Sequence, residues 1–146
     1  MVNELFNVEK MKFIDKFFKY ITYDEIKGNN KYLILDLRTM KEFNEKHLED
    51  SINFPLLSDS ISIKLEGMFL NRTYFTTAIK GLFYIMPRLS YIRKEIKRYE
   101  ENGIVVLGCR HARIRSRSIA MFVNVFGAKT LVLKGGVTPL VNSEKL

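Results

Sequence analysis

An apolar run that passes through a basic turn into a helical pattern constrains the fold of this chain more than any other segment. Residues 104–107, Ile-Val-Val-Leu, have the composition of a buried β-strand, and residues 116–126 carry apolar side chains at helical spacing. The turn between them holds Cys109, the only cysteine among 146 residues. A strand that leads through a turn into a helix is the repeating unit of a parallel α/β sheet. We therefore expect Cys109 at the carboxyl end of a strand, where such sheets bind ligands.

The rest of the chain alternates between the same two patterns. The predicted strands are the central strand at 31–37 and further strands at 51–55, 104–107 and 129–133, the last followed by a tail. The predicted helices are an amphipathic helical extension over residues 1–19, a short helix that the Thr22–Glu25 capping box begins and Gly28 ends, and helices at 40–46, 73–101 and 116–126, of which Pro87 kinks or divides the long one. We expect irregular structure with one helical turn at 58–70. This order predicts an α/β domain over residues 20–146, with a central, mostly parallel sheet and helices on both faces.

Composition is that of one globular domain, with 47% hydrophobic and 27% charged residues. A single cysteine excludes an internal disulfide and fits a reducing compartment. No uncharged run reaches the roughly 18 residues that a membrane helix needs, and the start of the chain lacks a secretory signal, so we expect a cytoplasmic protein and no membrane partner. We expect no cofactor and no zinc, because Cys109, His47 and His111 lack the paired spacing of zinc ligands.

Positive charge is concentrated in one part of the chain. The formal net charge is +8, and the segment from residue 88 to residue 117 contains nine basic residues and only three acidic ones. Clustered positive charge attracts polyanions such as RNA. The alternative is that this charge serves only solubility, since the chain has no RNA-binding motif with interleaved aromatic residues.

The turn around Cys109 carries the candidate chemistry. Four basic residues follow it within six positions: Arg110, His111, Arg113 and Arg115. Backbone N–H groups at a helix N-terminus attract anions, and nearby cations favour the thiolate over the thiol. A thiolate attacks electrophiles and can carry sulfur. The alternative is a structural cysteine that acts as a small buried hydrophobe, but four basic neighbours favour the reactive thiol.

Several blocks of sequence resemble rhodanese-like domains. Residues 34–43 and 47–55 look like the first-half signature of that family, and the Gly-Gly pair in residues 133–136 resembles its closing strand and turn. The resemblance is closest to the rhodanese-like domain of the tRNA 2-selenouridine synthases, which share the five-residue spacing between Cys109 and Arg115. This chain departs from them at residues 112–113, Ala-Arg, where that family has two glycines. Glycine lets N–H groups curl toward an anion without steric cost.

The resemblance implies a sulfur or selenium transferase that acts through a persulfide on Cys109, in tRNA 2-thiouridine or 2-selenouridine modification. The implied partners are a small sulfur- or selenium-donor anion and tRNA. In the synthases a nucleotide-binding P-loop domain follows the rhodanese-like part, and this chain has no P-loop motif. We therefore expect a separate P-loop protein, a fragment of a longer chain, or a free-standing relative with another task.

Residues of the turn are the candidate anion-binding set around the persulfide: Arg110, His111, Ala112, Arg113, Ile114, Arg115 and Ser116. A guanidinium at Arg115 suits bidentate binding of thiosulfate, a thiophosphate or selenophosphate. Ser116 is equally well explained as a helix N-cap, and His111 and Arg113 as surface residues. The supporting residues are Asp36, Arg38, His47, Gly135 and Gly136, together with Glu42, which the resemblance marks as structural.

Two other classes of protein fit the same turn. A cysteine, five residues and an arginine also form the loop of cysteine phosphatases built on a rhodanese-like fold and of related arsenate reductases, and this spacing admits a phosphate-sized anion. The turn itself has no acidic residue that could act as a general acid. A non-catalytic rhodanese-like binding module is the third reading, since Ala112 and Arg113 replace the loop glycines.

Overall fold

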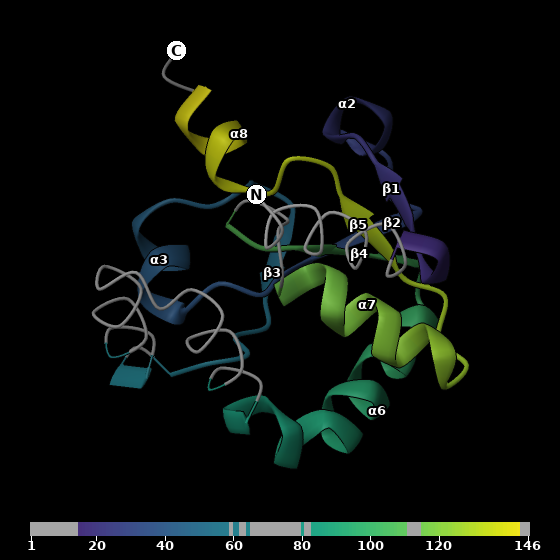
Figure 1. The fold of residues 1–146 in the computed structure, drawn as a ribbon. Helices are drawn as coiled ribbons and strands as arrows, with labels where there is room; N and C mark the ends of the chain where they lie inside the picture. Colours follow the sequence, from purple (N-terminus) through teal and green to yellow (C-terminus); the bar gives the residue numbers. More distant parts are fainter. Residues whose placement is uncertain are drawn as a thin grey trace, which may run out of the picture.

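The computed structural model describes residues 15–58, 60, 61, 64, 80, 83–110 and 115–143. In chain order the elements are η1 (Asp15–Phe17), β1 (Lys19–Ile21), α2 (Tyr23–Ile26), β2 (Tyr32–Asp36), α3 (Met40–Glu45), β3 (Ser51–Asn53), η2 (Met86–Arg88), α6 (Leu89–Glu100), β4 (Ile104–Gly108), α7 (Arg115–Val125), β5 (Leu131–Leu133) and α8 (Thr138–Ser143) (Figure 1). Residues 60, 61, 64, 80 and 83–85 are also helical.

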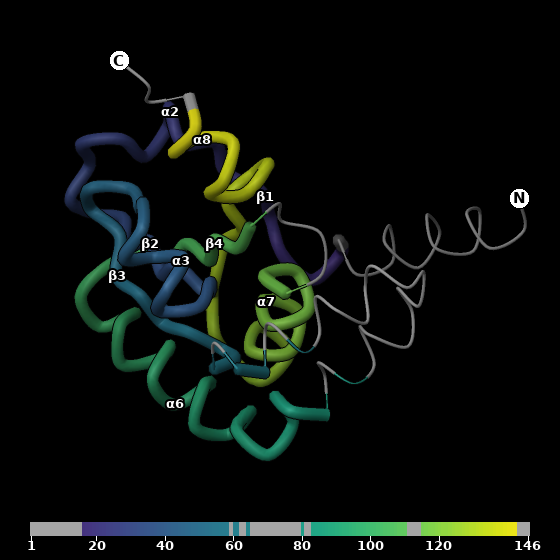
Figure 2. The backbone as a smooth tube through the Cα atoms, turned by 90° about the vertical axis from the view of Figure 1, so that its left-hand side faces the viewer, coloured from purple at the N-terminus to yellow at the C-terminus, as the bar shows by residue number. Residues whose placement is uncertain are grey.

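The five strands form one sheet in the order β1-β5-β4-β2-β3, and every neighbouring pair is parallel. Helices α6 and α7 lie below the sheet and α2 and α8 lie above it (Figures 1 and 2). The predicted parallel α/β fold with helices on both faces is thus confirmed. The prediction that residues 31–37 form the central strand is wrong, because β4 lies in the middle and β2 lies beside it.

Alternation along β4 divides the core into two halves. Val105 and Leu107 join the cluster that includes the buried residues of α6 and α7, whereas Val106 joins the cluster with α2 and α8. Successive side chains of a strand point to opposite faces, so each half of the core takes every second residue. Cys109 follows the parity of Val105 and Leu107 and belongs to the cluster with α7.

Gly108, the last residue of β4, faces the other half of the core. A Cβ at this position would lie 2.8 Å from Cγ2 of Val137, a residue that is fully buried. We therefore expect Gly108→Ala to lower the free energy of unfolding by about 1–3 kcal/mol, the usual cost of overpacking a core. Urea unfolding measures this, and Val137→Ala is the matched second change: the double variant is expected to lose less than the sum of the two single variants. Equal stability of Gly108→Ala and the wild type would contradict the predicted clash.

Two helices start with a capping box, of which the one at Thr22 was predicted from the sequence. Thr22 donates from its backbone N–H and its hydroxyl to Oε2 of Glu25, at 2.8 and 2.9 Å. These hydrogen bonds hold the pKa of Glu25 below its usual range. Thr39 and Glu42 form the corresponding capping box at α3. Both helices therefore begin where the sequence predicts.

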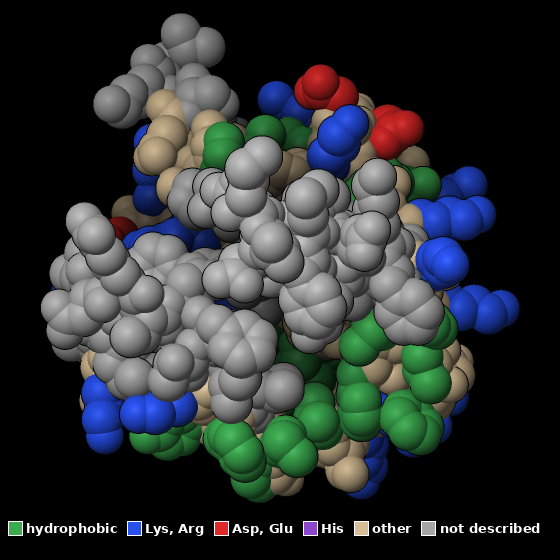
Figure 3. All heavy atoms as spheres, viewed as in Figure 1, with side chains coloured by type: hydrophobic (Ala, Val, Ile, Leu, Met, Phe, Trp, Pro, Cys, Tyr) green, Lys and Arg blue, Asp and Glu red, His purple; other side chains and the backbone are tan. Residues whose placement is uncertain are grey.

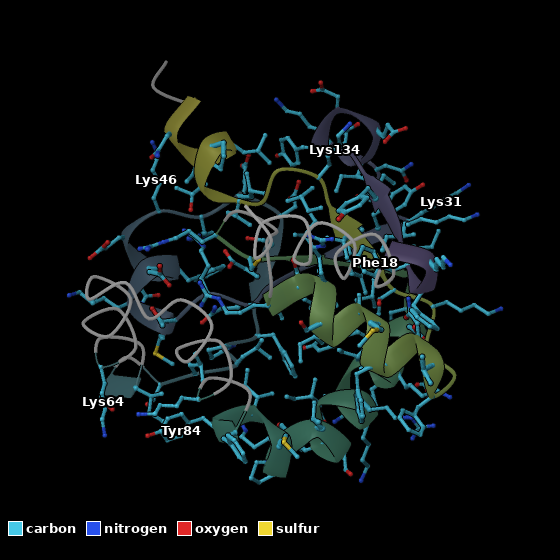
Figure 4. The ribbon with its side chains drawn as sticks, viewed as in Figure 1. Phe18, Lys31, Lys46, Lys64, Tyr84 and Lys134 are labelled. Atoms are coloured by element: carbon cyan, nitrogen blue, oxygen red, sulfur yellow. The ribbon has the colours of Figure 1, made fainter. Side chains whose placement is uncertain are left out.

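The ends of the chain and the long helix differ in part from the predictions. Pro87 does divide the helical region, because the η2 turn separates residues 83–85 from α6. The predicted tail contains α8, and residues 15–19 form η1 and the start of β1 rather than a continuing α-helix. Phe18 lies beside α7 and is buried in the core (Figure 4). Residues 1–14 of the predicted extension and most of the segment 58–82 lie outside the described residues.

Candidate active site

Cys109 lies at the carboxyl end of the central strand, next to Ser116 of α7. Its side chain is only 3% exposed, and its Sγ atom is 3.1 Å from Oγ of Ser116, which is fully buried. Either atom can donate this hydrogen bond. When the thiol is ionised, the hydroxyl must be the donor, because a thiolate sulfur can only accept. Among the described residues, Ser116 therefore offers a hydrogen-bond donor to a sulfur anion, at a position with little access for water.

Ser116 was expected to be either part of the site or the N-cap of the helix. Helix α7 begins at Arg115, so Ser116 is its second residue and not its N-cap. Its hydroxyl contacts the sulfur atom of the candidate nucleophile. The N-cap alternative is therefore wrong, since the chain is already helical at Arg115.

We expect Ser116→Ala to slow the reaction of Cys109 with small electrophiles by roughly tenfold at neutral pH, because a hydrogen bond to a charged group contributes about 1.5–3 kcal/mol. The measurement is the second-order rate constant for alkylation by iodoacetamide, which reports only on Cys109 because it is the sole cysteine. Ser118→Ala is the matched control, since it removes a half-buried hydroxyl from the same helix. Equal rates in the two variants would show that the Ser116 hydroxyl does not assist the thiol.

The carboxyl-terminal segment holds the backbone on either side of the thiol. The Val137 N–H donates to the Cys109 carbonyl at 2.8 Å, and the Thr138 N–H donates to the Arg110 carbonyl at 3.1 Å. The chain reaches this position through a turn at Gly135 and Gly136, whose φ angles of 79° and 81° favour glycine. The two predicted glycines thus lie next to the site through the segment that follows them.

Sequence reasoning missed the segment 137–143 as part of this arrangement. It becomes α8, and its first residues supply the two N–H groups that hold the start of the turn. A proline in the first turn of a helix is tolerated because the N–H it lacks has no intrahelical partner there. The Thr138-Pro139 pair is therefore the signal that could have predicted this helix.

The basic residues of the turn are only partly within the described structure. Arg110 is 45% exposed, and its Nη2 atom forms an ion pair with Oε1 of Glu42 at 2.9 Å. Arg115 is half-buried at the first position of α7. The remaining predicted anion-binding residues, His111, Ala112, Arg113 and Ile114, lie outside the described residues. The contact between Glu42 and the turn is a second feature that sequence reasoning missed.

Asp36 and Arg38 form a buried ion pair where β2 ends. Both carboxylate oxygens of Asp36 accept hydrogen bonds from the Arg38 side chain, with distances between 2.8 and 3.1 Å. Arg38 also donates to the carbonyl of Lys46, which Figure 4 labels just beyond α3. The pair therefore joins the end of β2 to the end of α3.

His47 packs on α3. Its ring stacks on Phe43 with 3.9 Å between the ring centroids, and Nδ1 lies 2.8 Å from the Phe43 carbonyl oxygen. Within the described part of the chain, no group of three or more His, Cys, Asp or Glu side chains could hold a metal ion. The described part of the site is thus a buried thiol next to a buried hydroxyl, followed in the chain by Arg110, which pairs with Glu42.

Comparisons with known proteins agree with the fold. The family described as the rhodanese-like domain matches residues 21–142. A search of the curated proteins finds no match. Three solved structures share the fold. The N-terminal domain of a protein assigned as ATP/GTP-binding, from Clostridium difficile 630, has a TM-score of 0.80 at 22% identity, over 88% of this chain and 100% of that one.

The other two structures are more distant. The Saccharomyces cerevisiae protein Ygr203w, a homologue of single-domain rhodanese and of the Cdc25 phosphatase catalytic domain, has a TM-score of 0.51 at 13% identity, over 83% of this chain and 78% of its own. The As/Sb reductase of Leishmania major has a TM-score of 0.51 at 15% identity, over 87% and 79%. At these identities the likeness extends to the fold alone.

Proposed function

The chain belongs to the rhodanese-like domain family, and we propose on that basis that it transfers sulfur or selenium through a persulfide on Cys109. The observation that carries the proposal is the position of the thiol. It lies at the carboxyl end of the central strand, with its sulfur 3.1 Å from the Ser116 hydroxyl in the first turn of α7. A hydroxyl in this position can donate to a sulfur anion, which a persulfide mechanism requires.

The first half-reaction loads the sulfur. The Cys109 thiol loses its proton to solvent, and the thiolate attacks the outer sulfur atom of an anionic donor such as thiosulfate. A bond forms between Sγ and that sulfur, the sulfur–sulfur bond of the donor breaks, and sulfite leaves with the electron pair. The Ser116 hydroxyl and the N–H groups at the start of α7 are suited to stabilise the negative charge on sulfur.

The second half-reaction unloads it. A nucleophile, such as cyanide in an assay, attacks the outer sulfur of the persulfide. A new bond to that sulfur forms as its bond to Sγ breaks, and the Cys109 thiolate is restored. Arg115, at the helix start, is suited to hold the anionic donor during loading, because a guanidinium offers paired donors to an oxyanion.

For the natural acceptor we propose tRNA, with a nucleotide-binding P-loop protein as the second partner, in the cytoplasm. The similar domain from Clostridium difficile is the N-terminal part of a protein assigned as ATP/GTP-binding, which supports this pairing.

Lysine and arginine side chains lie at several separate places around the face shown in Figure 3 rather than in one patch. Binding of purified protein to tRNA that weakens as salt rises is the expected result, and no binding at low ionic strength would remove RNA from the proposal. No helix among the described residues is long and apolar enough to cross a membrane.

A cysteine phosphatase or arsenate-reductase-like enzyme is the second candidate. Five residues separate Cys109 from Arg115, as in those loops, and the fold is shared with a homologue of the Cdc25 catalytic domain and with an As/Sb reductase. Such enzymes attack phosphorus or arsenic rather than sulfur. The two candidates therefore differ in the electrophile that Cys109 accepts.

Two turnover assays separate these candidates. We expect the protein to form thiocyanate from thiosulfate and cyanide and to leave an aryl phosphate intact. Hydrolysis of the aryl phosphate without thiocyanate formation would favour the phosphatase. Activity in neither assay would favour a binding module, whose partner binding should survive Cys109→Ser.

A further inference from the structure

The charge of Arg110, the residue that follows the candidate nucleophile, is paired with a residue of α3. Its Nη2 atom lies 2.9 Å from Oε1 of Glu42, whose side chain is only 18% exposed. The other carboxylate oxygen of Glu42 accepts hydrogen bonds from the Thr39 backbone N–H at 3.0 Å and the Thr39 hydroxyl at 3.1 Å. Because the capping box of α3 holds one oxygen, the other is presented to Arg110 from a fixed position.

The sheet register explains why residues so distant in sequence meet. Asp36 at the end of β2 pairs with Gly108 at the end of β4, and the Leu37 N–H donates to the Gly108 carbonyl at 2.7 Å. The segment that leads to α3 and the turn that carries Cys109 therefore leave the sheet side by side. The contact between Glu42 and Arg110 bridges these two segments at the carboxyl edge of the sheet.

We infer that Glu42 is a specificity-determining residue. Its ion pair with Arg110 restrains the positive charge next to Cys109. This lowers the preference of the Cys109 site for anionic over neutral electrophiles. An arginine in contact with a carboxylate presents an incoming anion with a dipole rather than a full positive charge. The anion must also compete with a partner that is already in place. The backbone of Arg110 is held as well, through its carbonyl and the Thr138 N–H.

This inference rests on the proposed function for its natural substrate, an anionic sulfur donor, but its test does not. The sole cysteine allows the preference to be measured directly, as the ratio of second-order alkylation rate constants for iodoacetate, an anion, and iodoacetamide, its neutral counterpart. Glu42→Gln is the variant of choice, because the amide oxygen can still accept from Thr39 and keep the α3 cap. Glu45→Gln is the matched control, since it removes the same charge from an exposed position on the same helix.

We expect Glu42→Gln to raise this ratio roughly threefold, because the released guanidinium of Arg110 can then pair with the incoming anion, and Glu45→Gln to change it less. Arg110→Gln should lower the ratio. In the Arg110→Gln background the effect of Glu42→Gln should shrink, because there is no longer a guanidinium to release. The effects should also decrease as salt rises.

Three results would overturn the inference. They are an equal ratio in Glu42→Gln and Glu45→Gln, an effect of Glu42→Gln that is the same with and without Arg110, and a thiol that neither reagent alkylates in any variant.

A thiosulfate assay then separates this inference from the proposed function. If sulfur is transferred, Glu42→Gln should lower the KM for thiosulfate more than it changes kcat. If no sulfur is transferred but the alkylation ratios behave as expected, only the proposed function fails.

Discussion

Cys109→Ser is expected to form thiocyanate from thiosulfate and cyanide at no more than about one thousandth of the wild-type rate, in line with the removal of other catalytic nucleophiles. The oxygen of serine is a far weaker nucleophile toward sulfur than a thiolate, and the site has no second cysteine to replace it. The side chain is 3% exposed and serine is nearly the same size, so the fold should persist. The measurement is the steady-state rate over a range of thiosulfate concentrations.

Urea unfolding of the same preparation is the control, because a loss of rate means little if the variant is unfolded. Ser118→Ala adds a comparison with a change on α7 that leaves the sulfur and its hydroxyl partner intact. Substantial thiocyanate formation by folded Cys109→Ser would remove the persulfide from the mechanism.

Asp36→Asn is expected to lower the free energy of unfolding by about 3–5 kcal/mol, because it leaves the guanidinium of Arg38 buried without a counter-charge. Asp36 is fully buried and Arg38 is 4% exposed, and they share three side-chain hydrogen bonds. A typical domain is stable by only about 5–15 kcal/mol, so this is a large part of the total. Urea unfolding at neutral pH measures the change.

Two further variants show whether burial of the charge is the cause. Asp36→Asn combined with Arg38→Met should lose less than the sum of the single changes, because the orphaned charge is gone. Arg98→Ala breaks an ion pair with Glu95 in which the arginine is 68% exposed, and it should cost less than about 1 kcal/mol. Equal losses in Asp36→Asn and Arg98→Ala would contradict the role given to the buried pair.

Local patterns predicted most of the fold. The apolar run before Cys109, the capping box at Thr22 and the proline at 87 act over a few residues, so the sequence alone indicates a strand, a helix start and a break. The order of the strands depends on which edges pair, which no local pattern records. That is why β4, and not residues 31–37, proved to be central.

The candidate site was predictable in position but not in contacts. The apolar run followed by a turn and a helical pattern places Cys109 at the carboxyl edge of the sheet. The Ser116 contact depends on how α7 packs against the end of β4, which a helical pattern in the sequence does not show. The pairing of Glu42 with Arg110 joins segments that only the β2–β4 register brings together.

The most direct test of the persulfide is the intact mass of the reduced protein after incubation with thiosulfate, before and after addition of cyanide. We predict a gain of one sulfur atom on the wild type, its loss on treatment with cyanide, and no gain on Cys109→Ser. An unchanged mass of the folded wild-type protein, or a gain that Cys109→Ser shares, would contradict sulfur transfer through Cys109.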